Sequence, residues 1–523
     1  MFNILTEPLI QTRTGQDMRV MSLPEVYAKL MADNVDAFPA LRPHQRHAWH
    51  AFLVQLGAMA MHRAEVNEPP RDPGQWAALL RGLTPDSPDD APWHVVVDDL
   101  IKPAFMQPPA RTVDRKREYK INVATPDQLD MLITAKNHDL KAAVAVRAGI
   151  DDWLFALITL QTMQGFSGGG SYGISRMNGG LASRPMLTMT PSSRVGAHVR
   201  RDIMAVLEYR PRLLAQFTMT EGGAGLLWIL PWDGGAEEAL AVDGLEPLYI
   251  EVCRRIRLSI DASGNLYGMR AASKATRVAG KELKGRTGDP WVPVNPRWKG
   301  LPLTPKIGCF TYRKITDYLT DWELPPLMRP TESENQAPQP MQLVARALVR
   351  GQGITAGYHE RIIPVRHKAV QSLGKPAEAL ELGIIARERV TQVGVVQRIL
   401  RRAIQVFAAR GDLGKITTEH RSLAQPWVNK HDEIIDRTFF EALQTEFEAP
   451  GEREGIRKAW LMNGRDGVVD HARRLLHAAA DTLPCLGVYR YRARANAGEL
   501  FEGGLRADSG LPFLFSTRNR EDQ

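Results

Sequence analysis

The sequence predicts an α+β protein, in which a mixed α/β amino-terminal part is followed by an all-helical carboxy-terminal part. From about residue 366 to 484, apolar residues recur at three- and four-residue spacing, and breaks at RGDLGK and APGERE divide the pattern. Such a series is typical of an antiparallel helical bundle. Upstream, short apolar runs end at turn residues, as in RALVRGQGITAGYHER, which predicts strand, tight turn and strand. We therefore expect a mixed α/β domain over 1–365, a helical domain over 366–484 and an irregular tail over 485–523.

Composition places the chain among ordinary globular proteins. It has 523 residues, of which 44% are apolar and 24% charged, so it can bury more than one core. The sequence contains no uncharged apolar run of about 18 residues and no basic, cleavable leader. We therefore expect neither a transmembrane helix nor a signal peptide. Three widely spaced cysteines without a CxxC pair indicate a reducing cytoplasm and argue against a zinc ribbon.

The net charge of +8 is a moderate basic excess, and part of it is clustered. Basic clusters occur at HVRRD (198–202), CRRIRLS (253–259) and RILRR (398–402). A basic surface attracts polyanions such as nucleic acid, although arginine runs also form solvated helix faces in proteins that bind none. Charge alone therefore leaves both interpretations open.

The first elements follow from turn and capping residues. Residues 2–11 and 17–22 predict a β-hairpin around TRTGQD, and SLPE at 22–25 predicts a capping box that begins a helix. Residues 84–127 are rich in proline and lack periodicity, which predicts loops. The apolar run DDWLFALITLQTMQ predicts a helix over 150–163.

A second early helix is expected over 43–62, and it carries His44, His47 and His50. Imidazoles at successive three-residue steps drift by about 60° around a helix, so the outer two diverge from one face. No fourth ligand lies at a suitable spacing in the sequence. We therefore expect no metal site among these histidines.

The middle of the chain mixes helix, strand and loop. A helix with arginines on one side is expected over 197–216, and GLLWILPW at 225–232 predicts a buried strand or a tryptophan-rich packing segment. Residues 246–260 predict a strand, which the turn DASGN joins to a pairing strand LYGMRAA. Residues 325–340 are dense in Pro, Glu and Gln and predict a linker.

The functional interpretation centres on 161–180, QTMQGFSGGGSYGISRMNGG. The consecutive glycines Gly168, Gly169 and Gly170 leave bare N–H groups that can form an anion-binding nest. GGGSYG at 168–173 also matches GxGxxG, which would indicate a nucleotide-binding enzyme. That motif should follow a strand and open a helix, whereas here it follows a predicted helix. A phosphate cradle, a nucleotide site and a plain surface loop remain open.

Just upstream, TAKNHD combines a cation, an amide, an imidazole and a carboxylate in Lys136, Asn137, His138 and Asp139. One hypothesis is a polar loop that reads a nucleic acid beside the glycine cradle. The alternative is a metal-dependent nuclease that uses His138 and Asp139. Such an enzyme needs further His, Asp or Asn ligands at defined positions, and none lies nearby in the sequence.

Two further segments are candidates for contact with phosphate or bases. Lys274 opens a basic segment that runs to Arg286 and contains no P-loop motif, so it is either a phosphate contact or a solvated loop. Gly351, Gln352 and Gly353 form the expected tip of a hairpin, where a glutamine between two glycines can approach another molecule closely. On these residues alone, an ordinary turn is the simpler interpretation.

Taken together, several stretches resemble the large subunit of the type I-E CRISPR surveillance complex, the CasA family of Cascade. The resemblance covers almost the whole chain, and its specificity lies in the order of the stretches rather than in any one of them. They are AFMQ (104–107), LDMLITAKNHDLKA (129–142), LQTMQGFSGGGSYGISRMNGG (160–180), EVCRRIRL (251–258), GDPW (288–291), RGQGITAGYHERIIP (350–364) and the carboxy-terminal bundle.

The resemblance implies a mixed α/β amino-terminal domain and a carboxy-terminal four-helix bundle. It also implies a cytoplasmic, non-catalytic subunit without a metal or cofactor, which assembles with crRNA and the other Cascade subunits. Such a subunit reads the protospacer-adjacent motif (PAM) in double-stranded target DNA, helps to open the duplex and recruits a helicase-nuclease.

Site residues are implied in the same way. Lys136, Asn137 and His138 resemble the PAM-sensing loop of the family, and Gly168 to Gly170 resemble its glycine loop. Lys274 lies near the position of a basic residue beside the minor groove. Gly351, Gln352 and Gly353 resemble a hairpin that wedges under the PAM, with Gln352 as the wedge.

Overall fold

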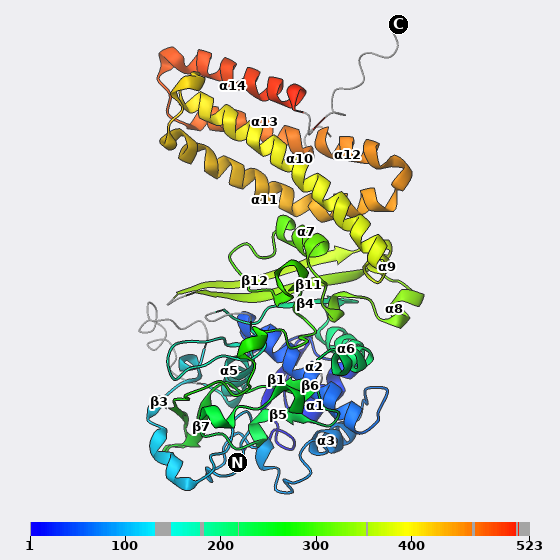
Figure 1. Ribbon diagram of the computed structural model, residues 1–523, viewed down its shortest axis with the longest axis vertical. Helices are drawn as coiled ribbons and strands as arrows, with labels where there is room; N and C mark the ends of the chain where they lie inside the picture. Colours follow the sequence, from blue (N-terminus) through cyan, green and yellow to red (C-terminus); the bar gives the residue numbers. More distant parts are fainter. Residues whose placement is uncertain are drawn as a thin grey trace. The chain divides into compact units, whose positions relative to one another are not determined.

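Helices and strands are mixed through the amino-terminal part of the chain, whereas the carboxy-terminal part is helical, which confirms the predicted fold class (Figure 1). The chain divides into unit 1, Met1–Phe310 with Asp321–Ile363, and unit 2, Thr311–Thr320 with Pro364–Gln523. The short segment 311–320 was not expected to join the helical unit. The structure is a computed structural model that describes residues 2–130, 148–177, 182–217, 219–351, 354–462, 466–508 and 511.

Helix α2, Arg46–Arg63, lies at the centre of the unit 1 core and is buried on every face over most of its length. It packs against α5 (Ile150–Met163), α6 (Val195–Phe217) and β6 (Leu245–Ile250), as Figure 1 shows. A helix that is apolar all round is the kind that a protein interior accepts, because each face can remove apolar surface from water.

The predicted amino-terminal hairpin and capping box both form, but the first strand begins at Ile10 and not at residue 2. Strand β1, Ile10–Thr14, pairs antiparallel with β2, Asp17–Met21. Helix α1, Leu23–Met31, begins at the N-cap Ser22, whose amide donates to Oε2 of Glu25 at 2.7 Å. Helix α3 (Pro73–Arg81) then packs against α1.

The hairpin predicted around residue 352 belongs to a three-stranded sheet of order β12-β11-β4. Its strands are β4 (Met186–Thr190), β11 (Met341–Gly351) and β12 (Ile354–Val365), and β11 runs antiparallel to β4. A second sheet has the order β3-β8-β7, with β3 at Ile121–Val123. Besides the β1–β2 hairpin, β5 (Ala224–Leu226) pairs with β6, and β9 (Val294–Asn295) pairs with β10 (Leu301–Pro302).

The prediction of one strand over 246–260 is wrong, because the segment forms two strands in different sheets. Strand β6 ends at Ile250, and β7, Arg255–Ile260, pairs with β8, Leu266–Ala271, across the predicted turn. At the break, Oε1 of Gln161 accepts from the amides of Cys253 and Arg254 at 2.9 and 2.8 Å. A buried glutamine from α5 thus replaces the strand partner that these main-chain groups would otherwise need.

The tryptophan-rich segment 225–232 is a packing segment, with Trp228 and Trp232 fully buried. The segment 325–340 is not a linker between the units. It lies within unit 1 as η10 (Pro326–Met328) and α8 (Glu332–Gln336).

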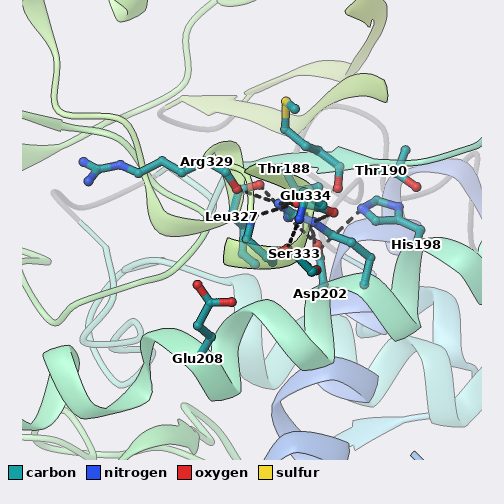
Figure 2. Close-up of polar contacts among 12 residues, drawn as sticks. Thr188, Thr190, His198, Asp202, Glu208, Leu327, Arg329, Ser333 and Glu334 are labelled. Carbon is teal, nitrogen blue, oxygen red and sulfur yellow. Dashed lines mark hydrogen bonds and ion pairs between the residues drawn. The ribbon is translucent and has the colours of Figure 1, made fainter. Parts of the chain in front are cut away.

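The side chain of Arg201 holds this segment in place. It donates to the carbonyls of Leu327 and Arg329 at 2.8 and 2.6 Å and pairs with Glu334 at 3.1 Å. Figure 2 shows Leu327 and Glu334 next to α6, with the side chain of Arg329 directed away from them. The composition of this segment predicted a linker, but long-range bonds from the buried Arg201 fix it within unit 1.

Unit 2 contains the expected long helices, and α10 packs against α11, α13 and α14. The helices described in this unit are most of α7 (Tyr312–Asp321), α9 (His367–Leu373), α10 (Pro376–Ala408), α11 (Thr418–Glu448), α12 (Arg453–Met462), α13 (Val468–Thr482) and α14 (Gly487–Ala507). None of the helices in the described part of the chain is long and apolar enough to span a membrane.

The expectation of an irregular tail is wrong for residues 487–507, which form α14. The buried positions on this helix are Ala493, Ala497, Phe501 and Leu505, each four residues after the last. A Cβ added at Gly504 would lie 3.0 Å from Cγ2 of Ile399 on α10, so small residues allow the two helices to approach closely. One narrow stripe, half of it alanine, is a weak signal among arginines and glycines, which explains why the sequence pattern missed this helix.

Candidate nucleic-acid interface

The glycine loop, Gly168 to Gly170, follows α5 and forms a tight turn. The amide of Ser171 donates to the Gly168 carbonyl at 3.0 Å, and the amide of Ser167 donates to the Ser171 carbonyl at 2.9 Å. Gly168 and Gly170 have φ angles of +104° and +78°, which glycine adopts without strain. The next regular element is the strand β4 and not a helix, so the loop lacks the context of a dinucleotide-binding motif.

Part of this loop presents bare main chain to open space. A Cβ added at Gly168 or Gly169 would meet nothing within 4 Å, and Gly169 is exposed. Another backbone can therefore come close to these peptide groups. Phe166, at 38% exposure, lies beside this surface, with its ring centroid 5.7 Å from that of Tyr172.

The glycine loop lies directly beside the segment that carries Lys274. The amide of Ser273 donates to the Gly170 carbonyl at 3.2 Å, and a Cβ on Gly170 would lie 2.9 Å from Cβ of Ala272. The amide of Lys274 itself donates to the Gly234 carbonyl at 2.7 Å, while its side chain is exposed. Among the residues that the structure describes, no ion pair engages the Lys274 ammonium. Two candidates a hundred residues apart in the sequence therefore share one surface.

The side chain of Arg254 forms hydrogen bonds with residues on both sides of the glycine loop. It donates to Oε1 of Gln164 at 2.9 Å, to the carbonyl of Gly165 at 3.3 Å and to the carbonyl of Tyr172. The side chain is buried, at 2% exposure, and desolvation lowers its pKa. Because an arginine remains protonated at neutral pH, this residue adds a fixed positive charge under the loop.

Two more arginines bring charge to the same place. Nη2 of Arg270 donates to Oγ of Ser171 at 3.3 Å. Burial lowers the pKa values of Arg270 and Arg350, and repulsion from Arg254 lowers both further. Nε of Arg270, and Nε and Nη1 of Arg350, are buried without a hydrogen-bond partner among the described residues. These three guanidinium groups, which we call the arginine cluster, would be stabilised by an anion.

The hairpin strand β11 reaches the base of the glycine loop. Gln164 forms an isolated bridge with Ser183, and Oγ of Ser183 donates to the Leu348 carbonyl at 2.5 Å. Gly351 is the last residue of β11, three positions beyond Leu348. Gln352 and Gly353, the expected tip, lie outside the described residues.

The expected polar loop also lies outside the described residues, including Lys136, Asn137, His138 and Asp139. Asp130, the last described residue before it, accepts from Nη1 of Arg42 and bonds Nε2 of His44, both at 2.9 Å. The charge of Asp130 acts on Arg350 and partly offsets the burial and the repulsion from Arg254 that lower its pKa. The chain therefore enters the polar segment close to the arginine cluster.

Sequence reasoning assigned the loop glycines and Lys274 but missed the arginine cluster. The run CRRIRLS was visible as a basic segment, yet its arginines alternate with apolar residues and point into the protein rather than into solvent. Arg350 directly precedes the Gly351 turn and was read as part of a strand. One signal was available in the sequence. A buried strand with this many arginines needs groups that pair with their charges, so the run itself indicated a site for anions.

Comparison with known proteins identifies the family. The model of the family described as CRISPR-associated protein Cse1 matches residues 3–461. The chain is similar to the solved structure of Cse1 from Thermobifida fusca, with 16% identity and a TM-score of 0.67 over 98% of this chain and 99% of that one. No curated protein matches the sequence.

Two further solved structures show the same fold. CasA (Cse1) of Thermus thermophilus has 15% identity and a TM-score of 0.59 over 96% of this chain and 99% of that one. A chain in a structure described as a CRISPR RNA-guided surveillance complex has 14% identity and a TM-score of 0.57, over 96% and 98%. Because the family model spans most of its length, the chain belongs to the CRISPR-associated protein Cse1 family.

Proposed function

We propose that the chain is a non-catalytic subunit of a crRNA-guided antiviral surveillance complex. In this proposal it recognises the PAM in double-stranded target DNA, helps to unwind the duplex at the start of R-loop formation and recruits a helicase-nuclease. Membership of the Cse1 family supports the assignment to such a complex, as does the likeness to a chain in a CRISPR RNA-guided surveillance complex. The other subunits and the crRNA would be its permanent partners.

The proposed binding of DNA depends on one observation. The glycine loop adjoins the Lys274 segment, and the arginine cluster lies behind this junction. The Gly170–Ser273 hydrogen bond joins bare main chain to a segment with an exposed cation, Lys274, which pairs with none of the residues that the structure describes. Behind the same loop, Nε of Arg270 and two nitrogens of Arg350 have no hydrogen-bond partner within the described part of the chain. Phosphate groups are ligands that would suit both the accessible main chain and the positive charge.

The proposed reading of the PAM follows from the same chemistry. The minor groove shows a degenerate pattern of acceptors, so small and polar groups can accept several related sequences there. Glycines at 168 and 169 would let main chain reach a floor that larger side chains block. In the proposal, Lys136, Asn137 and His138 read base edges, and Lys274 contacts the backbone beside the minor groove.

Strand opening is assigned to the hairpin tip, Gly351, Gln352 and Gly353. Inserting a side chain at one base step costs a few kcal/mol of stacking. Pairing between guide and target then replaces the lost base pairs about evenly, as described for Cas9-type R-loops. A wedge of one uncharged side chain is therefore sufficient, and no bond-breaking group is needed.

The assembled complex should be tested on a library of duplexes that carry one guide-matched target with randomised flanking positions. We expect a small set of flanking sequences to be enriched among bound duplexes, and the enrichment to weaken in a Lys136→Ala, Asn137→Ala double variant. Equal recovery of every flanking sequence by the wild-type complex would contradict PAM recognition. Magnesium-dependent cleavage by the isolated chain that is lost in His138→Ala would contradict the non-catalytic assignment.

A further inference from the structure

Outside the candidate interface, two imidazoles and one carboxylate meet in the interior of unit 1. His50 comes from α2, and His198 and Asp202 come from α6. Their nearest donor atoms all lie within 4.8 Å of one another, and all three side chains are buried. Figure 2 shows His198 and Asp202 side by side on α6, with Thr188 of β4 next to them.

Helix geometry explains why these groups converge. His198 and Asp202 are four residues apart, so they lie on the same face of α6 one turn from each other. That face packs against α2, which presents His50. Two ligands at this helical spacing, completed by a third from a neighbouring helix, are a common way to bind a metal ion in a helical scaffold.

His198 lacks a satisfactory hydrogen-bond partner. Its Nε2 lies 3.5 Å from Oδ2 of Asp202, which is longer than the 2.7–3.2 Å of a normal N–H···O bond. No described residue offers this buried nitrogen a better contact. Buried polar atoms are almost always paired, so this ring nitrogen, which faces a carboxylate beyond normal hydrogen-bond distance, is available to bind a metal ion.

The carboxylate of Asp202 is held so that one oxygen faces both imidazoles. Oδ1 of Asp202 accepts from Oγ1 of Thr188 at 2.9 Å and from Nη1 of Arg201 at 3.2 Å. The other oxygen, Oδ2, lies 2.8 Å from Nε2 of His50. The charge of Arg201 is shared with Glu334, at 3.1 Å. A second arginine, Arg346, also acts on His198, but it pairs with Glu360 at 2.9 Å. The carboxylate of Asp202 is therefore left to the two imidazoles and to Arg201.

We propose that His50 Nε2, His198 Nε2 and Asp202 Oδ2 form a zinc site that clamps α2 to α6. Zinc bonds of about 2.0–2.1 Å in a tetrahedral site separate ligand atoms by about 3.3 Å. The two observed separations to Oδ2, 2.8 and 3.5 Å, bracket that value, so small side-chain rotations suffice. A cavity of about 370 Å³, lined in part by His50, His198 and Thr190, provides room for water as the fourth ligand.

The site has a structural role in this proposal. Helix α6 carries Arg201, which fixes the 325–340 segment, and α2 is the centre of the core. A metal that joins the two helices would stabilise the scaffold on which β4 and the β11–β12 hairpin rest. The sequence pattern of His44, His47 and His50 gave no sign of it, because the other two ligands are about 150 residues away.

Metal content of the full-length chain tests the proposal directly. Purified protein would be stripped with a chelator, incubated with ZnCl₂, dialysed and measured by inductively coupled plasma mass spectrometry. We expect about one zinc per chain, and a melting temperature several degrees higher than that of the stripped protein. With CoCl₂ in place of zinc, we expect visible absorption bands of a tetrahedral nitrogen–oxygen site.

A matched pair of variants locates the ligand set. His198→Gln should lose the retained metal and the thermal shift, whereas His62→Gln should keep both, because His62 is a solvent-exposed histidine of the same helix α2 that pairs with Glu221. Circular dichroism would verify that each variant folds. Wild-type protein that retains no zinc, or His198→Gln protein that retains as much as wild type, would show that the cluster is only a hydrogen-bonded brace.

Discussion

The carbonyl of Gly170 accepts a hydrogen bond of 3.2 Å from the amide of Ser273. This bond joins the glycine loop to the residue before Lys274 and gives both candidates a common surface. Arg254 and Arg270 lie under that surface and hold Gly165 and Ser171, respectively. The loop is therefore preorganised by protein contacts, and a ligand does not have to order it on binding.

The first prediction concerns the glycine loop itself. Gly170→Ala should destabilise the loop by at least about 1–2 kcal/mol, because its φ of +78° strains any residue with a Cβ. The added carbon would also lie 2.9 Å from Cβ of Ala272. We expect a lower melting temperature and weaker binding of target duplex by the assembled complex.

Gly169→Ala is the matched control, because a Cβ there meets nothing within 4 Å. Its stability should remain within about 0.5 kcal/mol of wild type, as for most surface substitutions. If binding nevertheless falls in Gly169→Ala, the bare main chain itself contacts DNA. Equal behaviour of the two variants in thermal melting would contradict the strain argument.

The second prediction concerns Lys274. Lys274→Ala should weaken binding of the assembled complex to all duplexes alike and reduce the slope of log K against log salt by about 0.9, the value for one phosphate contact. Affinities at several salt concentrations would measure this. Lys102→Ala is the control, because Asp89 already neutralises that exposed lysine at 2.7 Å. An unchanged salt slope in Lys274→Ala would remove the residue from the interface.

The third prediction concerns the proposed wedge. Gln352→Ala should slow R-loop formation by the assembled complex while leaving the melting temperature and crRNA binding unchanged. The reason is that a shorter side chain cannot hold an unstacked base step open. Stopped-flow fluorescence of a base analogue next to the PAM would report the opening rate. An opening rate equal to that of wild type would count against the wedge.

The fourth prediction concerns a buried ion pair in unit 2. Glu446 and Arg389 are both fully buried, with Nε of Arg389 2.6 Å from Oε2 of Glu446, and Arg457 pairs with the same carboxylate. Glu446→Gln should cost about 3–5 kcal/mol, because it leaves buried guanidinium charge uncompensated. Glu388→Gln removes a half-exposed partner of Arg457 and should cost less than about 1 kcal/mol. Urea denaturation of both variants would test the contrast.

The fifth prediction concerns pH. Burial raises the pKa of Glu251 from 4.5 to about 7, although hydrogen bonds from Ser175 oppose the shift. The folded state therefore binds more protons than the unfolded state between these pH values. The stabilising contribution is complete below pH 4.5 and is lost as the pH rises to about 7. The loss is at most about 3 kcal/mol.

Glu251→Gln removes this titration while keeping an oxygen that can accept from Ser175, whose amide and hydroxyl donate at 2.8 and 2.7 Å. The variant should gain stability relative to wild type as the pH rises from 5 to 8. The exposed Glu68→Gln variant should instead follow wild type across that range. Parallel stability curves for wild type and Glu251→Gln would contradict the raised pKa.

Local patterns in the sequence were sufficient for some elements and misleading for others. The capping box at Ser22, the hairpin turn at 261–265 and the long helices of unit 2 depend on neighbouring residues, and all three are confirmed. The break after Ile250 and the ordered 325–340 segment depend on single side chains from elsewhere, Gln161 and Arg201. The pattern within one segment cannot predict side chains that reach it from distant parts of the sequence.

The sequence by itself determined the order of elements, the glycine loop and the resemblance that pointed to the Cse1 family, because turns, caps and periodicity are written in adjacent residues. Only the tertiary structure decided that Gly170 adjoins Lys274, that Arg254, Arg270 and Arg350 form one cluster, and that His50 meets His198 and Asp202. Gly170 and Lys274, Arg254 and Arg350, and His50 and His198 are each roughly 100 to 150 positions apart. Packing of the core selects such pairs from many that the same composition allows.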